Sequence, residues 1–355
     1  MDKSAQNFLR QLLETPTPSG WEMPGQRLIA EYVRPYADSV DVDVHGNLHA
    51  VVNPDAPVRI MIDGHCDEIG LMVQHVDNEG FLYMAAVGGV NIQLLPGERL
   101  VLQGRKGPVR GVVGAKAIHL MDAKEREHGV AKLTDLWVDI GASSREEALE
   151  AVAIGTPAVA ETGWRELLGD RVSARAMDDR VGAFVVMDAL RRLKGRKLNV
   201  AVHAISSTQE EMGLLGAKVA AFGVAPQAGI AVDVTFASDD PGKDEKRVGQ
   251  IKLGGGPVLA YGPAYDKSLN ERIEAAAAAS QVTLQPQATA RASGTNAFAI
   301  RMSRSGAAVS LVSVPLRYMH TPVETLSLSD VEQASQLLAD TLAAMPADPV
   351  FGPRL

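Results

Sequence analysis

The sequence predicts an α/β fold in which a mostly parallel sheet is flanked by helices and a small β-barrel-like domain is inserted into the chain. Two patterns lead to this prediction. Toward both ends, short apolar runs of strand length alternate with stretches of helical periodicity, the order that lays parallel strands beneath helices. Between them, residues 71–164 carry dense turn signals such as Asp77-Asn78-Glu79-Gly80 and no long helical period, which is typical of a small barrel.

The N-terminal elements follow from local patterns. Apolar residues spaced three and four apart predict helices over residues 8–13 and 28–33. Residues 40–44 alternate valine with polar side chains, which predicts a half-buried strand. The turn at 45–47 then leads into a partner strand that begins near Leu48.

Beyond residue 165 the alternation of strands and helices returns. Strands are expected at residues 199–206, 228–232 and 307–314, and helices at 181–193, 214–222, 269–279 and 331–342. Residues 1–70 and 165–355 are therefore predicted to form one sheet domain, interrupted by the inserted β domain of residues 71–164.

Composition limits the classes of function. With 355 residues, 46% of them hydrophobic, the chain can bury a large core and is long enough for two domains. A formal net charge of −8 argues against nucleic-acid or anionic-membrane partners, because phosphate binding needs a basic patch. The single cysteine, Cys66, excludes an internal disulfide and fits a reducing compartment. Neither a signal-peptide pattern nor an apolar run of the ~20 residues that span a bilayer is visible, so we expect a cytoplasmic protein.

Side chains of the types that bind metals stand where predicted strands end, at five places. They are His65 with Asp67, the pair Asp178-Asp179, the pair Glu210-Glu211, Asp233 and His320. Each alone has a structural explanation, such as a polar turn, a helix N-cap, a helix-dipole partner or a histidine at the edge of the core. Because the carboxyl ends of parallel strands meet at one edge of a sheet, however, all five places are expected to converge.

The strand pattern also predicts the directions in which the side chains of residues 65–67 point. Alternate residues of a strand share a face, so His65 and Asp67 lie on one side and Cys66 points the other way, into the core. Cys66 is therefore interpreted as a small buried hydrophobic residue. Asp67 can hold one imidazole nitrogen of His65 while the other nitrogen binds a metal.

Taken together, the histidines and carboxylates indicate a metal centre. Mixed nitrogen and oxygen donors suit Zn²⁺, Co²⁺ or Mn²⁺ equally, so the metal stays open. So many carboxylates at one place would force some to be protonated unless cations neutralise them. The motifs HExxH, GxSxG and GxxxxGK[ST], which would indicate other chemistries, are missing from the sequence.

The sequence resembles the tetrahedral (TET) aminopeptidases of metallopeptidase family forty-two, which include glutamyl aminopeptidases and were formerly described as cellulase M. The matching segments come in the family's order and cover nearly the whole chain. They are Pro18-Ser19-Gly20-Trp21-Glu22, Gly64-His65-Cys66-Asp67-Glu68-Ile69-Gly70, Ala176-Met177-Asp178-Asp179-Arg180-Val181-Gly182, Thr208-Gln209-Glu210-Glu211-Met212-Gly213, Val232-Asp233-Val234 and the run from Pro315 to Glu324.

The resemblance implies a pair of divalent metal ions and an activity that removes N-terminal residues from small peptides. By carry-over, His65 and Asp233 would hold one ion, Glu211 and His320 the other, and Asp178 would bridge both. Asp67 would orient His65, and Glu210 would be the general base. The resemblance also implies a zinc-peptidase-like sheet domain and an inserted β domain that serves assembly into a homododecamer.

The sequence departs from the family where Gly294-Thr295-Asn296-Ala297 replaces the frequent Gly-Thr-Asp-Ala. We expect Asn296 to lie near the substrate and to favour neutral or apolar N-terminal residues. Three alternatives stay open at this point. They are a metal-dependent deacylase or carboxypeptidase on a related fold, a glycoside hydrolase, for which aromatic residues are scarce at 5%, and a scaffold without activity.

Overall fold

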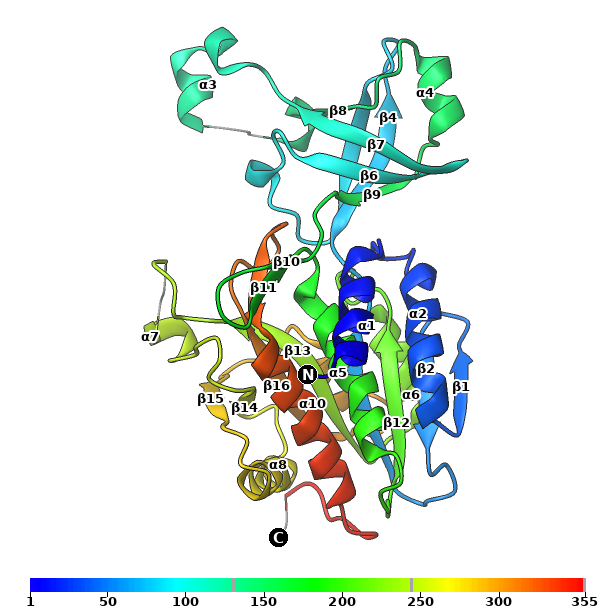
Figure 1. Cartoon of the computed structure of the whole chain (residues 1–355), viewed down its shortest axis with the longest axis vertical. Helices are drawn as coiled ribbons and strands as arrows, with labels where there is room; N and C mark the ends of the chain where they lie inside the picture. The colour runs from blue at the N-terminus through cyan, green and yellow to red at the C-terminus, as the bar shows by residue number, and fades with distance from the viewer. Residues whose placement is uncertain (129–131, 243–244, 354–355) are drawn as a thin grey trace.

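The computed structural model describes residues 1–128, 132–242 and 245–353 of the chain. Figure 1 shows a large domain in which helices cover a central sheet, and a smaller barrel that stands at one end of it. This confirms the predicted fold class of a helix-flanked sheet with an inserted barrel. Within the described residues, no helix is long and apolar enough to cross a membrane.

The central sheet has eight strands, and its four middle strands are parallel. In spatial order the strands are β1 (Ser39–Val42), β2 (Leu48–Val52), β12 (Ala201–Ser207), β3 (Arg59–His65), β13 (Ala228–Phe236), β16 (Ala308–Leu316), β14 (Val258–Tyr261) and β15 (Gln285–Ala288). Strands β12, β3, β13 and β16 run parallel, whereas β2 pairs antiparallel with β12 and β14 with β16. The polar residues that follow the parallel strands therefore gather at one edge.

Alternation along the middle strands separates two apolar layers. Ile60 and Ile62 of β3 pack on one face, together with α1 (Lys3–Glu14), α2 (Met23–Val33), α5 (Met177–Leu193), α8 (Lys267–Ala279) and α10 (Leu328–Ala343). Met61 points to the other face, which α6 (Leu215–Val224) and α9 (Asn296–Arg301) cover. Cys66 is fully buried in the first layer, as predicted.

The inserted barrel is closed and has its own core. Its strands, in order around the barrel, are β4 (Gly70–Val76), β5 (Leu82–Val87), β8 (Trp137–Asp139), β7 (Gly107–Gly114), β6 (Arg99–Gly104) and β9 (Pro157–Ala160). Leu71, Leu82, Leu100 and Val138 pack inside it. The connections carry η2 (Ile92–Leu94), η3 (Ile118–Leu120), α3 (Ala123–His128), η4 (Leu133–Asp135) and α4 (Arg145–Ala151).

Several elements differ from the sequence prediction. The strand expected over residues 40–44 ends at Val42, and Val44 is fully exposed because it lies in the turn between β1 and β2. The short strands β14 and β15 were not predicted. Neither was the small sheet of β10 (Arg165–Glu166), β11 (Arg171–Ala174) and β17 (Glu324–Ser327), which adjoins the barrel in Figure 1. The other described elements are η1 (Arg34–Tyr36) and α7 (Glu245–Val248).

Candidate metal centre

The seven predicted site residues converge at the carboxyl edge of the parallel strands. His65 is the last residue of β3, and Asp233 lies in the second half of β13. Asp178 lies at the start of α5, where the backbone of Asp178 and Asp179 is not helical and the peptide bond between them is cis. Asp67, Glu210, Glu211 and His320 lie in the connections that follow β3, β12 and β16.

Asp178 lies between the two histidines. Its Oδ1 atom is 3.3 Å from Nε2 of His65, and its Oδ2 atom is 3.2 Å from Nε2 of His320. Nε2 of His320 is also 3.3 Å from Oε1 of Glu211. One carboxylate oxygen therefore faces each histidine, which is the placement that a bridging ligand requires.

Potential ligand atoms form two groups of three that share Asp178. The first group is His65, Asp178 and Asp233, and the second is Asp178, Glu211 and His320; within each group the ligand atoms lie within 4.8 Å of one another. His65, Glu210 and Glu211 form a further group by the same criterion. Mixed imidazole and carboxylate donors fit divalent ions such as Zn²⁺, Co²⁺ or Mn²⁺, so the residues present suit a pair of such ions.

Asp67 is fully buried and connects His65 to the loop that carries the two glutamates. Its Oδ1 atom lies 3.3 Å from Nδ1 of His65 and accepts a hydrogen bond of 2.9 Å from the Glu210 amide. Its Oδ2 atom accepts hydrogen bonds from the Glu211 amide and the Ser19 hydroxyl. One carboxylate thus orients the histidine and fixes the backbone of both glutamates.

Two further buried acids, Glu324 and the predicted neighbour of Asp178, Asp179, also position the site, although neither was assigned a role from the sequence. Glu324 accepts a hydrogen bond of 2.7 Å from the His320 amide and one of 3.1 Å from the Asp178 amide. Asp179 accepts hydrogen bonds from the amides of His65 and Gly182. Each acid thus combines one local contact with one to a residue more than a hundred positions away, Glu324 to the Asp178 amide and Asp179 to the His65 amide, and the distant contact could not be predicted from a local pattern.

Without cations, burial and neighbouring charges shift the pKa values of the clustered side chains. Burial raises the pKa of Glu210 to about 7. Burial and then the neighbouring Asp178 raise the pKa of Asp233 well above its ordinary value. Hydrogen bonds to Asp178 and Glu211 raise the pKa of His320 to about 11. Burial alone would raise the pKa of Asp178, but hydrogen bonds from His320 and His65 hold it below the ordinary range. Divalent ions would neutralise the carboxylates and so replace the protons that these raised pKa values retain.

A buried ion pair ties the site to the N-terminal helix. Arg175 and Arg180 both approach the carboxylate of Glu68, at 3.2 Å and 3.5 Å, and all three side chains are buried. The two guanidinium groups also donate to carbonyl groups at the end of α1, such as that of Leu13. Each charge therefore has partners, as burial demands.

Asn296 does not lie where we expected it from the sequence. Thr295 is the N-cap of α9, and Asn296 is the first residue of this helix. Only 1% of Asn296 is exposed. Its Nδ2 atom donates to Oδ1 of Asp63 at 2.7 Å and to Oγ of Ser207 at 2.9 Å. The residue therefore belongs to a buried polar cluster behind His65, and it does not line the substrate cleft.

A cleft of about 730 Å³ opens over the candidate metal centre. Beyond the site residues, its apolar wall includes Phe236, Leu311 and Met319. Arg247 of α7 also lines it, and its guanidinium has no ion-pair or hydrogen-bond partner among the residues that the structure describes. A cleft of this size can hold several residues of a peptide.

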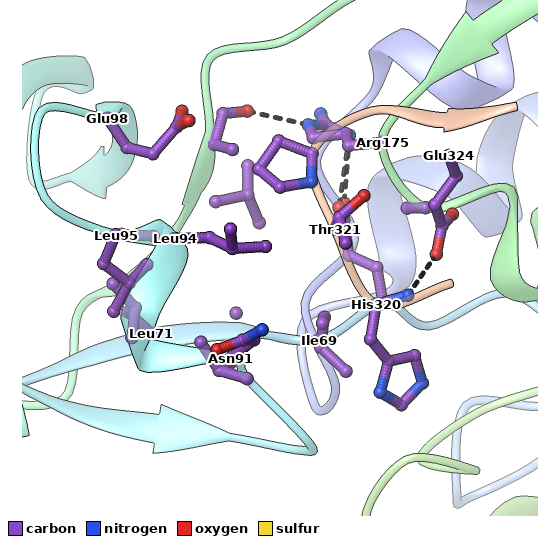
Figure 2. Close-up of a pocket in the computed structure, with 18 of the residues that line it drawn as sticks. Ile69, Leu71, Asn91, Leu94, Leu95, Glu98, Arg175, His320, Thr321 and Glu324 are labelled. Carbon is purple, nitrogen blue, oxygen red and sulfur yellow. Dashed lines mark hydrogen bonds and ion pairs between the residues drawn. The ribbon is translucent and has the colours of Figure 1, made fainter. Parts of the chain in front are cut away.

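A second, smaller pocket of about 70 Å³ lies on the other side of His320, between the two domains. Figure 2 shows Leu94, Leu95 and Glu98 of the barrel on one side of it and Thr321 and Glu324 on the other. The wall is mostly aliphatic. The loop that carries His320 and the barrel thus lie close together next to the candidate metal centre.

Comparison with known proteins assigns this combination of fold and site to the peptide hydrolases. The family model for M42 glutamyl aminopeptidase matches residues 46–337, and the chain belongs to this family of aminopeptidases. The chain is 35% identical over 334 residues to the lysyl aminopeptidase of Pyrococcus furiosus, an alignment that covers 93% of this chain and 94% of the relative. The resemblance and the enzyme class predicted from the sequence are confirmed.

Solved structures agree with this assignment. The TET aminopeptidase from a marine sediment archaeon of the Thaumarchaeota superposes with a TM-score of 0.91 at 33% identity, covering 97% of this chain and 98% of that one. The Pyrococcus horikoshii TET1 peptidase, described as able to assemble into a tetrahedron or a large octahedral shell, has a TM-score of 0.85 at 32% identity, covering 96% of this chain and 100% of that one.

Proposed function

We propose that this aminopeptidase hydrolyses the N-terminal residue of small peptides with two divalent ions and Glu210 as the general base. The observation that carries the proposal is the position of Asp178, with one oxygen toward each histidine. In this assignment His65 and Asp233 hold one ion, Glu211 and His320 hold the other, and Asp178 contacts both. When bound, the ions would supply Lewis acidity that polarises the scissile carbonyl and lowers the pKa of a water molecule.

Glu210 is the acid of the cluster that is best placed to move a proton. It lies next to Glu211 in the connection that follows β12, and it lines the cleft. Its Oε2 atom lies 3.8 Å from Nε2 of His65. Burial raises its pKa to about 7 in the cluster without cations. Its carboxylate is assigned to neither ion, so it stays available to exchange a proton with water. Glu210 takes a proton from the attacking water at its carboxylate and later delivers it to the leaving amine.

Asp67 and Glu324 act as positioning residues in this mechanism. Asp67 holds Nδ1 of His65, which leaves Nε2 directed at Asp178. Glu324 fixes the backbone of Asp178 and His320 from beneath. The ligand set is therefore organised before any substrate arrives, which limits the reorganisation that the reaction requires.

The cleft supports a preference for neutral or apolar N-terminal residues over cationic ones. Phe236, Leu311 and Met319 offer apolar surface to the first side chain. The guanidinium of Arg247, for which the described part of the chain offers no partner, repels cationic side chains, so peptides that begin with lysine should be poorer substrates than those that begin with leucine. The relatives' names do not decide this, because they include a lysyl and a glutamyl aminopeptidase.

The assembly of the chain is proposed from its relatives. One solved relative is described as a dodecamer in the asymmetric unit, and it has a TM-score of 0.84 at 31% identity. We infer a homododecamer for this chain as well. Light scattering of the purified protein would measure its mass directly.

The proposed function is tested with a panel of aminoacyl chromogenic substrates, assayed with a chelator and after Zn²⁺, Co²⁺ or Mn²⁺ is restored. We expect activity that chelation abolishes and metal restores, and that requires a free α-amine. N-acetylated substrates are the matched control, since a deacylase would accept them. Activity that survives complete removal of metal would contradict the proposal.

A further inference from the structure

Two glycines of the inserted barrel pack against the candidate metal centre. Gly88 and Gly89 lie between β5 and η2, in the connection between barrel strands β5 and β6 that contacts the loop of His320. The carbonyl oxygen of Gly89 lies 3.2 Å from Nδ1 of His320, so it can accept a hydrogen bond from this nitrogen. That bond fixes the tautomer in which Nε2 is free to face Asp178 and Glu211.

A side chain at either glycine would force its neighbours to shift. A Cβ atom at Gly89 would lie 3.0 Å from Nδ1 and 3.2 Å from Cε1 of His320. A Cβ atom at Gly88 would lie 3.3 Å from Cβ of Glu211 and 2.8 Å from Cγ2 of Ile69. The pair therefore touches both residues that complete the second group of ligands.

The first group of ligands has a different origin. His65 and Asp233 come from strands β3 and β13 of the central sheet, and Asp178 comes from α5, which packs on it. The second group relies on His320, which lies in a loop and contacts the barrel on one side and Glu324 on the other. The central sheet thus positions the first group, whereas the second group also depends on a contact with the barrel.

We propose that Gly88 and Gly89 are positioning residues through which the inserted barrel sets the affinity of the Glu211–His320 metal position, while the His65–Asp233 position is independent of the barrel. This inference rests on the proposed two-ion function. It gives the barrel a role in the metal centre in addition to any role in assembly. Removing or displacing an outer partner of a ligating histidine typically weakens metal binding ~10–100-fold.

The test uses Gly89→Ala, because the backbone at Gly89 does not have the positive φ that favours glycine, so the imidazole is the main obstacle to the methyl group. Gly163→Ala is the matched control: it also lies near the domain junction, and its Cβ would meet Glu14 atoms at an ordinary 3.7 Å. Gly88→Ala is the second variant, and its control is Gly97→Ala. Both Gly88 and Gly97 have positive φ, 77° and 85°, but a Cβ at Gly97 meets nothing within 4 Å.

The metal-free full-length proteins are titrated with Co²⁺ alone, and bound metal is counted by elemental analysis. We expect the wild type and both controls to bind two ions. Gly89→Ala and Gly88→Ala should each bind one ion with wild-type affinity and the other ~10–100-fold more weakly. Adding Asp233→Asn to Gly89→Ala should weaken the remaining position as well. The inference is overturned if both glycine variants bind two ions as the wild type does, or if they weaken both positions equally. Fewer than two ions in the wild type would instead contradict the proposed function.

Discussion

Replacing Asn296 with aspartate should destabilise the protein, although it restores a residue that is frequent in the family. The change removes the two hydrogen bonds that Nδ2 donates and places a second carboxylate 2.7 Å from Oδ1 of Asp63. Burial raises the pKa of Asp63 to about 7, so above this pH its carboxylate is charged. A lost hydrogen bond to a charged group then costs about 1.5–3 kcal/mol, and the repulsion of two buried carboxylates adds to this. We therefore expect the free energy of unfolding to fall by about 3 kcal/mol.

This loss can be measured as a change in melting temperature. At ~2.1 cal/mol/K per residue, the unfolding entropy of 355 residues is about 0.75 kcal/mol/K, so the melting temperature should fall by about 4 °C. The loss should shrink at lower pH, because a proton shared by the two carboxylates removes their repulsion.

The double variant Asp63→Ala with Asn296→Asp isolates the cause. It keeps one carboxylate in the cluster, so it should recover most of the stability lost by Asn296→Asp alone. The reasoning would be refuted by a single variant as stable as the wild type. It would also be refuted by an equal effect of Asn296→Asp whether or not Asp63 is present.

Four further predictions follow from the site and the sheet. Glu210→Gln should keep its bound metal but lower kcat ~10²–10⁴-fold; near-normal turnover would refute its role as base. Asp178→Ala should empty both metal positions, which elemental analysis would show. Arg247→Ala should raise kcat/KM for lysyl relative to leucyl substrates a few-fold, and an unchanged ratio would count against repulsion by Arg247. Burial lowers the pKa of His203 to about 4 from 6.5, so the unfolded state binds more protons between these values and stability falls as pH drops through them. His203→Gln should reduce that loss by about 1 kcal/mol, because His203 is only partly buried; acid denaturation curves that coincide would contradict this.

The sequence was sufficient to predict that the candidate side chains gather at one edge of the sheet, because strand periodicity and the convergence of strand ends are general rules. His65 and Asp233 follow apolar runs that could only be inner strands, and both lie at the predicted edge. The assignment of individual ligands and of Glu210 as base came from resemblance to a family, and it stays a prediction.

Other features depend on contacts that no local pattern encodes. Strand β15 has the sequence Gln285-Pro286-Gln287-Ala288, which lacks apolar alternation and is held by its neighbour β14. The inward turn of Asn296 is set by the start of α9, one residue beyond the Gly294-Thr295 segment that lines the cleft. The role of Glu324 depends on the distant Asp178 amide.

The most direct test of the account is the position of the metals in a crystal of the protein grown with Co²⁺ or Zn²⁺. An anomalous difference map should show two peaks, one among His65, Asp178 and Asp233 and the other among Asp178, Glu211 and His320. A single peak at full occupancy, or metal that does not contact Asp178, would contradict the account.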